Sequence, residues 1–195
     1  MRIIAGKYKK RQLDTPEDES ITRPITDRVK ESLFNKLFSM GALDGGNVID
    51  AFAGTGTLGL EALSRGMTHC TFIERHRKIG ELLTGNIESL GLTLGSDAHV
   101  LHSDTLTAGW VNLLPKRPVS LIFLDPPYPL AQDPTTLAAL MRLIETLMAT
   151  DGVCTPDCIL HLRTPKEIEP PPAKGWGGPV REVYGTQALN FYGPE

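Results

Sequence analysis

The stretch that decides the fold is Val48-Ile49-Asp50-Ala51-Phe52-Ala53-Gly54-Thr55-Gly56-Thr57-Leu58-Gly59. It consists of a buried apolar strand, a glycine-rich turn and the start of a helix. The glycines have the spacing G-x-G-x-x-G, which is typical of the turn that receives a nucleotide-like cofactor in a parallel sheet. Glycine-rich turns also serve tight packing alone, so the spacing by itself does not identify a ligand.

Strands and helices alternate outward from this stretch. Apolar positions at helical spacing predict helices from about 27 to 41 and over 58–64, 77–90 and 137–148. Apolar runs predict strands over 47–52, 70–74, 99–103, 119–124, 158–162, 180–184 and 187–192. The prolines and glycines of 170–179 predict an exposed loop. This alternation predicts an α/β fold with a mostly parallel sheet and helices on both faces.

Four acids fall at or just past the ends of predicted strands, namely Asp50, Glu74, Asp104 and Asp125. Ligands of open parallel sheets bind outside the carboxyl ends of the strands, so we expect these acids to surround one site. Two simpler interpretations stay open. Glu74 could be an exposed acid beside arginines, and Asp104 could serve only as a turn or cap residue.

The charge of these residues distinguishes between two cofactor classes. A dinucleotide presents an anionic pyrophosphate to the glycine loop, and a like-charge contact near 4 Å costs on the order of 1 to 4 kcal/mol. S-adenosylmethionine instead carries a sulfonium and an ammonium, which an acid-lined pocket attracts. Glu74 lies 24 residues after Asp50, where a carboxylate is expected to bind the ribose hydroxyls. We therefore expect S-adenosyl-L-methionine as the cofactor.

The tetrapeptide Asp125-Pro126-Pro127-Tyr128 follows the most apolar predicted strand. The prolines stiffen the segment and donate no N–H, so their carbonyls are expected to serve as acceptors beside the carboxylate. Together these groups can accept both hydrogens of an exocyclic amine while Tyr128 stacks on its ring. The pattern suits methyl transfer to the amino group of a base, with these four residues as the catalytic set. A strand-ending turn with a surface tyrosine is the alternative.

The first residues form a basic segment of different character. Residues 1–11 contain five basic residues and no acid, which gives them a charge of +5. Ile3, Ile4, Tyr8 and Leu13 lie among the lysines and indicate a strand or hairpin that docks on the rest of the chain. We expect two units, a basic extension over 1–26 and a catalytic domain over 27–195. A solvated, flexible terminus is the simpler alternative.

Composition limits the classes of function. The chain has 195 residues with 20 basic and 23 acidic side chains, a net charge of -3, which excludes a globally basic nucleic-acid coat protein. No apolar run reaches the ~18 residues that span a membrane, and no signal peptide is apparent. Cys70, Cys154 and Cys158 are too few for a disulfide scaffold and form no metal-ligand pattern. We expect a cytoplasmic monomer without a metal.

Nearly the whole chain resembles the RsmD family, bacterial S-adenosylmethionine-dependent methyltransferases of guanine N2 in small-subunit rRNA. The resemblance lies in residues 2–8, 23–35, 50–66, 125–128 and 184–185. It implies a seven-stranded Rossmann-like methyltransferase fold with the last strand antiparallel. It also implies 16S rRNA, within the small subunit or an assembly intermediate, as the partner. Two departures are Lys10, where the family usually has glycine, and Ile25, where it often has threonine.

From these arguments we assign two sets of binding residues. The cofactor-binding set is Asp50, Phe52, Ala53, Gly54, Gly56, Glu74, Arg75, Asp104 and Thr105. The substrate-binding set is Arg2, Lys7, Lys9, Lys10, Arg11, Arg23 and Arg28. The target guanine is expected at 125–128.

Three other functions stay open. An amino-methyltransferase acting on DNA or RNA adenine, or on protein glutamine, would share the catalytic tetrapeptide. A dinucleotide-dependent oxidoreductase would share the glycine loop, although the acidic strand ends disfavour it. A non-catalytic RNA-binding module or assembly factor would share only the basic extension.

Overall fold

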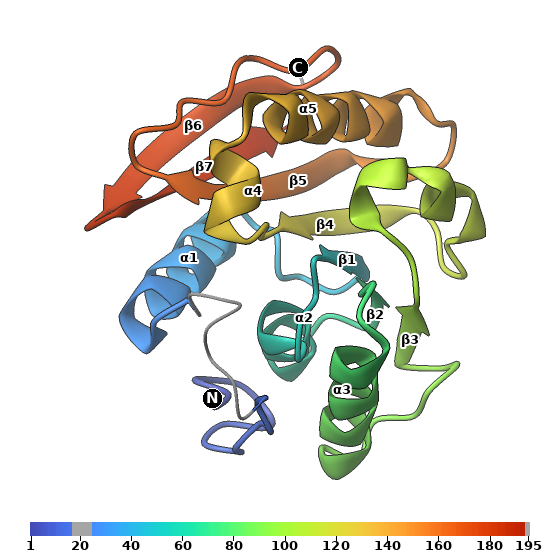
Figure 1. The fold of residues 1–195 in the computed structure, drawn as a ribbon. Coiled ribbons are helices and arrows are strands. Elements are labelled where there is room, and N and C mark those ends of the chain that lie inside the picture. The colour runs from blue at the N-terminus through green and yellow to red at the C-terminus, as the bar shows by residue number, and fades with distance from the viewer. Residues whose placement is uncertain (17–24, 194–195) are drawn as a thin grey trace.

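The computed structural model describes residues 1–16 and 25–193, and its centre is a seven-stranded sheet (Figure 1). The strands are β1 (Asn47–Ala51), β2 (His69–Ile73), β3 (Ala98–Leu101), β4 (Val119–Leu124), β5 (Cys154–Pro165), β6 (Gly177–Tyr184) and β7 (Gln187–Gly193). The helices are α1 (Asp27–Ser39), α2 (Thr57–Ser64), α3 (Arg77–Ser89), α4 (Tyr128–Gln132), α5 (Pro134–Ala149) and the 3-10 helices η2 (Thr105–Thr107) and η3 (Gly109–Leu113). Within the described ranges, no helix has the length and apolarity to cross a membrane.

The strands lie in the order β3-β2-β1-β4-β5-β7-β6. The first five pair in parallel, whereas β7 runs antiparallel to both β5 and β6. This arrangement confirms the predicted fold class. The chain moves outward from β1 to β3 and then crosses to β4 on the other side of β1. The strand order therefore reverses between β1 and β4, which is where sheets of this kind form a ligand crevice.

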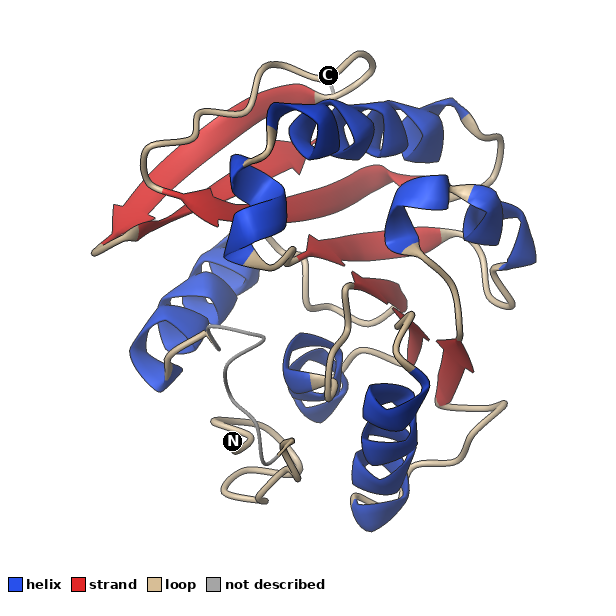
Figure 2. Cartoon of the chain, viewed as in Figure 1, coloured by secondary structure: helices blue, strands red, loops and turns tan. Residues whose placement is uncertain are grey.

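Side chains of the central strands alternate between two apolar cores on opposite faces of the sheet. In β4, Leu121 and Phe123 pack in the core that contains α1, α2 and α3. Ile122 and Leu124 pack in the core that contains η3 and α5. Figure 2 shows the helices flanking the strands. Because both faces of β4 are covered, its sequence is almost continuously apolar instead of alternating.

Two glycines of the loop bring α2 close to its neighbours. A Cβ at Gly59 would lie 2.3 Å from the ring of Phe72 in β2, and a Cβ at Gly56 would lie 2.5 Å from Leu83 in α3. Gly54 has open space around its Cα, with no atom within 4 Å of an added Cβ. Packing therefore accounts for the second and third glycines of the motif, whereas Gly54 leaves room for a ligand.

Residues 1–13 form a short hairpin, which confirms that this segment docks on the rest of the chain. The Ile3 N–H donates to the Arg11 carbonyl at 3.0 Å, and the Leu13 N–H donates to the Met1 carbonyl at 2.7 Å. Ile3 and Leu13 are buried in the core that contains α1, α2 and α3. The hairpin thus contributes to the same core as the helices.

Glu61 in α2 connects the hairpin to the helices. Its Oε2 accepts the Ile4 N–H at 2.7 Å, and its Oε1 accepts the Ala5 N–H at 3.0 Å. Lys30 Nζ lies 3.6 Å from Oε2, and Arg65 Nε lies 2.8 Å from Oε1. The carboxylate is fully buried, so these two cations and two backbone donors compensate for its loss of water.

The structure differs from the predicted elements after Asp104 and near the C-terminus. Residues after Asp104 form η2 and η3, to which the sequence pattern assigned no element. The predicted exposed loop over 170–179 is partly wrong, because β6 already begins at Gly177. Trp176 just before it is buried, and its indole N–H donates to the Ile144 carbonyl of α5 at 2.9 Å. A tryptophan with a buried hydrogen-bond acceptor anchors the segment to α5 despite its prolines and glycines.

Candidate active site

A cavity of about 570 Å³ opens at the carboxyl ends of β1, β2 and β4. Most of the predicted cofactor-binding residues line it, namely Asp50, Phe52, Ala53, Gly54, Glu74, Arg75, Asp104 and Thr105. Asp125, Pro127 and Tyr128 of the predicted catalytic set line the same cavity. The structure therefore brings the glycine loop and the tetrapeptide together.

Other predicted residues lie elsewhere. Neither Gly56 nor Pro126 is among the residues that line the cavity, and Arg23 lies outside the described residues. The remaining predicted substrate-binding residues are exposed on the hairpin and α1, away from the cavity wall: Arg2, Lys7, Lys9, Lys10, Arg11 and Arg28. The hairpin nevertheless adjoins the cavity, because Met1 lines it.

Asp50 at the end of β1 is almost completely buried, with 1% of its surface exposed. Its Oδ2 accepts the Gly59 N–H at 2.8 Å, which ties the strand to α2. Burial, and secondarily the nearby charges of Asp125 and Glu74, raises the pKa of Asp50 to about 8. A buried acid of this kind favours a cationic ligand, because a positive charge would compensate for its lost hydration.

Glu74 organises the glycine loop. Its Oε2 accepts the Gly54 N–H at 3.0 Å, and its Oε1 accepts the His76 N–H at 2.7 Å. It is 8% exposed, so the structure does not support an exposed surface acid. Next to the loop, Phe52 has a φ of 74°, a left-handed conformation that costs a residue with a Cβ roughly 1 to 2 kcal/mol. Such strain tends to occur at functional sites, where surrounding contacts maintain it.

Asp104 caps a short helix and also lies in the cavity wall. Its Oδ1 accepts the Leu106 N–H at 3.0 Å and so caps η2. The same residue lines the cavity. Capping uses one carboxylate oxygen, which leaves the other available to a ligand.

The segment after β4 turns into a short helix. Pro127 is the N-cap of α4, and its carbonyl accepts the N–H groups of Leu130 at 2.9 Å and Ala131 at 3.2 Å. The expectation that both prolyl carbonyls face a substrate is therefore wrong for Pro127. The physical reason is that the carbonyl of an N-cap residue accepts the first hydrogen bonds within the helix. Asp125 remains as the acceptor of the tetrapeptide that lines the cavity.

Arg163 is a cavity residue that the sequence pattern did not identify. It follows the apolar part of β5 and is 5% exposed. Its Nε forms an ion pair with Oδ1 of Asp125, and its Nη1 donates to Oε1 of Gln187 at 3.1 Å. Its position just past a predicted strand end is the signal that located the acids. The same signal identifies this cation once basic residues at strand ends are considered as well as carboxylates.

Thr55 in the glycine loop lines the cavity, and its hydroxyl is buried. Its Oγ1 has no hydrogen-bond partner among the described residues. Buried hydroxyls are nearly always hydrogen-bonded in folded proteins. The Thr55 hydroxyl therefore has unused hydrogen-bonding capacity next to the cavity.

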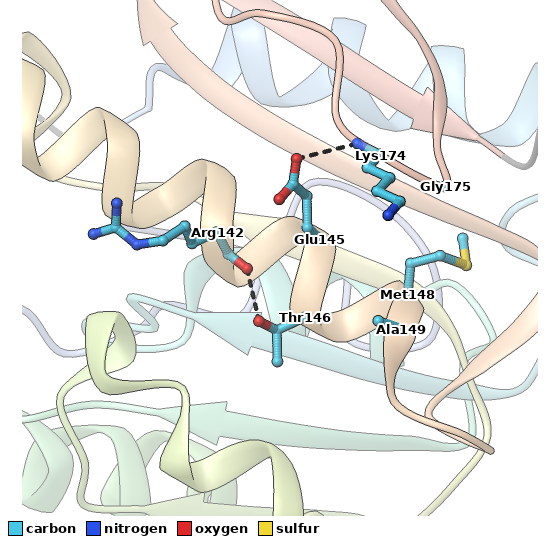
Figure 3. Close-up of a pocket in the computed structure, with 7 residues that line it drawn as sticks. All are labelled: Arg142, Glu145, Thr146, Met148, Ala149, Lys174 and Gly175. Carbon is cyan, nitrogen blue, oxygen red and sulfur yellow. Dashed lines mark hydrogen bonds between the residues drawn. The ribbon is translucent and has the colours of Figure 1, made fainter.

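A second hollow, of about 510 Å³, lies on the outer side of α5 (Figure 3). The backbone N–H of Lys174 donates to Oε1 of Glu145 at 3.3 Å there. None of the predicted site residues lines it. Across the described parts of the chain, no cluster of three or more His, Cys, Asp or Glu side chains could hold a metal ion. The first cavity is thus the candidate active site.

Comparisons with known proteins agree with this location. The family model described as Conserved hypothetical protein 95 matches residues 1–193. YlbH of Bacillus subtilis strain 168, provisionally named an rRNA methyltransferase, is 37% identical over 195 residues that cover 98% of each protein. Ribosomal RNA small subunit methyltransferase D of Escherichia coli K12 is 36% identical over 197 residues, covering 98% of this chain and 89% of that protein.

A solved structure leads to the same family. The provisionally named methyltransferase yhhF of Escherichia coli has a TM-score of 0.78 and 29% sequence identity, and the match covers 100% of this chain and 98% of that chain. The agreement thus extends over the complete sheet as well as the sequence. The chain belongs to the Conserved hypothetical protein 95 family, the RsmD methyltransferase family that its sequence resembles.

Proposed function

We propose that this protein transfers a methyl group from S-adenosylmethionine to the exocyclic N2 amine of a guanine in 16S rRNA. The observation that carries the proposal is the single cavity in which the acid-lined glycine loop faces Asp125 and Tyr128. A relative that is 36% identical bears the name ribosomal RNA small subunit methyltransferase D, which supports the substrate class.

The cavity residues fit this cofactor better than a dinucleotide. Asp50 would hold the positively charged amino acid end, Glu74 the ribose hydroxyls, and Asp104 with Thr105 the adenine. The unpartnered Thr55 hydroxyl supports a polar ligand there. An anionic pyrophosphate would instead face buried carboxylates, which is unfavourable. When bound, S-adenosylmethionine supplies an electrophilic methyl carbon attached to a positively charged sulfur.

Asp125 and Tyr128 act on the guanine. The amine is a weak nucleophile, because its lone pair is delocalised into the ring. Asp125 accepts an N–H of the amine and directs the nitrogen, while the Tyr128 ring stacks on a base that has left its stack in the RNA. As positive charge develops on nitrogen, the carboxylate stabilises it. The methylated nitrogen then releases one proton, which Asp125 or water accepts.

The basic hairpin contacts the RNA in this proposal, as part of the extension over 1–26. Its five basic residues are exposed, and Glu61 holds its backbone next to the cavity. Lys10 has a φ of 71° at the hairpin turn, a conformation that favours glycine. A lysine that adopts this unfavourable conformation is consistent with a contribution to binding, such as a phosphate contact.

The partner in this proposal is the small ribosomal subunit or an assembly intermediate, and the enzyme acts on it as a cytoplasmic monomer. A basic hairpin on a chain of net charge -3 fits a local RNA contact better than indiscriminate coating of nucleic acid.

A labelled-methyl assay tests the proposal. Purified 30S particles and naked 16S rRNA from a strain without the enzyme are incubated with the protein and labelled S-adenosylmethionine. We expect label in N2-methylguanine from at least one of these substrates. Adenine-containing DNA and a glutamine peptide serve as competing acceptors. Label in methyladenine or methylglutamine, with none in guanine, would overturn the assignment of the acceptor.

The substitution Asp125→Asn tests the catalytic role within that assay. The amide keeps the shape of the side chain but removes the charge that stabilises the developing cation. We expect kcat to fall by about 10² to 10³-fold, the usual effect of removing one transition-state contact. Calorimetry with S-adenosylhomocysteine should give an almost unchanged Kd. An unchanged kcat would contradict the assigned role of Asp125.

A further inference from the structure

Arg163 lies at the meeting point of three strand ends. Parallel pairing of β4 and β5 places Leu124 opposite Leu162, so the next residues, Asp125 and Arg163, lie side by side. Antiparallel pairing of β5 and β7 places Pro165 opposite Gln187, the first residue of β7. The closing strand therefore reaches the candidate active site through Gln187.

Arg163 contacts both residues that are assigned to the guanine. Its Nε forms the ion pair with Oδ1 of Asp125, and its guanidinium carbon lies 5.3 Å from the centroid of the Tyr128 ring. Gln187 holds the guanidinium from the other side through Nη1 at 3.1 Å. One planar, fully charged group thus contacts both a carboxylate and an aromatic ring.

The geometry of the ion pair suggests how the guanidinium acts. A carboxylate on a short side chain rotates about its χ angles unless a partner holds it, and the Nε contact engages Oδ1. The second oxygen, Oδ2, is then presented in one orientation. Because Arg163 is 5% exposed and Asp125 is 14% exposed, little water competes with the pair.

We propose that Arg163 is a positioning residue for methyl transfer. It orients the Asp125 carboxylate and the Tyr128 ring so that they receive the guanine amine, and Gln187 orients Arg163 in turn. The inference rests on the proposed function, because it concerns the residues that hold the acceptor base.

The substitution Arg163→Gln tests this role in steady-state assays with the 30S or rRNA substrate. Misplacement of a reacting group by about 1 Å can reduce the rate by ~10²-fold, so we expect kcat to fall by about 30- to 100-fold. KM for the RNA and the Kd of S-adenosylhomocysteine should change less than about threefold, since Arg163 orients the acceptor and does not hold the RNA backbone.

The variant Arg163→Lys keeps the charge but loses the planar fork that contacts Asp125 and Gln187 together. We expect it to recover part of the rate, to within about tenfold of the wild type. Gln187→Ala should lower kcat less than Arg163→Gln, and the double variant should be no worse than Arg163→Gln alone. Additive losses would contradict the proposed chain of contacts.

A matched control is Arg181→Gln. Arg181 is a half-buried arginine of β6 that donates to the Ile168 carbonyl at 2.7 Å and does not line the cavity. Its substitution should lower the melting temperature without changing kcat. The positioning role is wrong if Arg163→Gln, like Arg181→Gln, lowers the melting temperature but leaves kcat unchanged. It is also wrong if Arg163→Gln raises KM instead of lowering kcat.

The outcomes separate the inference from the proposed function. A wild-type protein that binds S-adenosylhomocysteine but methylates no guanine overturns the function. An active wild type with an unchanged kcat in Arg163→Gln overturns only the positioning role. Loss of S-adenosylhomocysteine binding would show that Arg163→Gln does not fold. In that case the kcat values of Arg163→Lys and Gln187→Ala test the positioning role, and wild-type kcat values in both variants would refute it.

Discussion

At the scale of single residues, the most consequential feature is the buried acid Asp50. A carboxylate at this depth without a cation is destabilising, because its charged form loses its hydration. The Gly59 N–H compensates for part of that loss. The site therefore sacrifices some stability in the free protein in order to favour a positively charged ligand.

This feature predicts a pH dependence of stability. In the folded protein the pKa of Asp50 is raised to about 8 from an ordinary 3.8. Between these pH values the unfolded chain has released a proton that the folded protein retains. The free energy of unfolding should therefore fall as pH rises through this window, by at most about 1.4 kcal/mol per pH unit from this group. Urea unfolding of the ligand-free protein from pH 5 to pH 8 measures the slope.

The control for this prediction is Asp50→Asn, which keeps an acceptor for the Gly59 N–H but does not titrate. Its unfolding free energy should fall less steeply over the same pH range, and it should bind S-adenosylmethionine more weakly. Identical slopes for the variant and the wild type would show that Asp50 does not titrate as described.

At the scale of elements, the contact between the hairpin and α2 fixes the proposed RNA-binding residues relative to the rest of the protein. Gly6 shows how close the contact is, since a Cβ there would lie 1.8 Å from the Ser64 carbonyl oxygen. Glu61 adds hydrogen bonds to two successive backbone N–H groups. The position of the basic residues thus depends on a buried carboxylate in a helix far from them in the sequence.

We predict that Glu61→Ala destabilises the protein by about 3 to 5 kcal/mol, because it leaves Lys30 buried without its partner. Backbone amides of the hairpin should exchange faster with deuterium. RNA affinity should also fall, because the hairpin is held less firmly. Glu81→Ala is the control, since Glu81 pairs with Arg77 at 3.2 Å on the surface. It should change stability by less than about 0.5 kcal/mol. Equal effects of the two substitutions would contradict the role of Glu61.

At the scale of the whole molecule, charge is distributed unevenly. The chain is acidic overall, with a net charge of -3, yet the hairpin carries five basic residues. RNA binding through such a segment releases counterions, whereas recognition of the base does not depend on them. Affinity and catalysis should therefore respond differently to salt.

We predict that RNA affinity falls linearly with the logarithm of salt concentration, with a slope of about 0.7 per phosphate contact on single strands. Replacing Lys7, Lys9 and Lys10 by alanine should reduce that slope by about 2 if each lysine contacts one phosphate. Filter binding at several salt concentrations measures it. Alanine at Lys116, Lys166 and Lys174, three exposed lysines elsewhere, should leave the slope unchanged. A slope that no variant changes would exclude the hairpin from binding.

The sequence by itself determined the mostly parallel sheet and the place of the cavity at the carboxyl ends of its strands. Hydrophobic periodicity and turn residues are local signals, and the carboxyl ends of parallel strands meet at one edge. The proximity of acids such as Asp50 and Asp125 could therefore be predicted from the sequence. The docking of Ile3 and Leu13 followed from apolar residues in a basic segment.

Only the tertiary structure decided which polar groups of the site pair with each other. Asp125 and Arg163 are 38 residues apart, and their pairing depends on the register between β4 and β5. Two other contacts depend likewise on where an element begins. They are the hydrogen bonds of the Pro127 carbonyl within α4 and the hydrogen bond between Arg163 and Gln187. Such contacts are selected by the mutual fit of whole elements, because each polar group binds the partner that packing brings near it, and no local pattern encodes that choice.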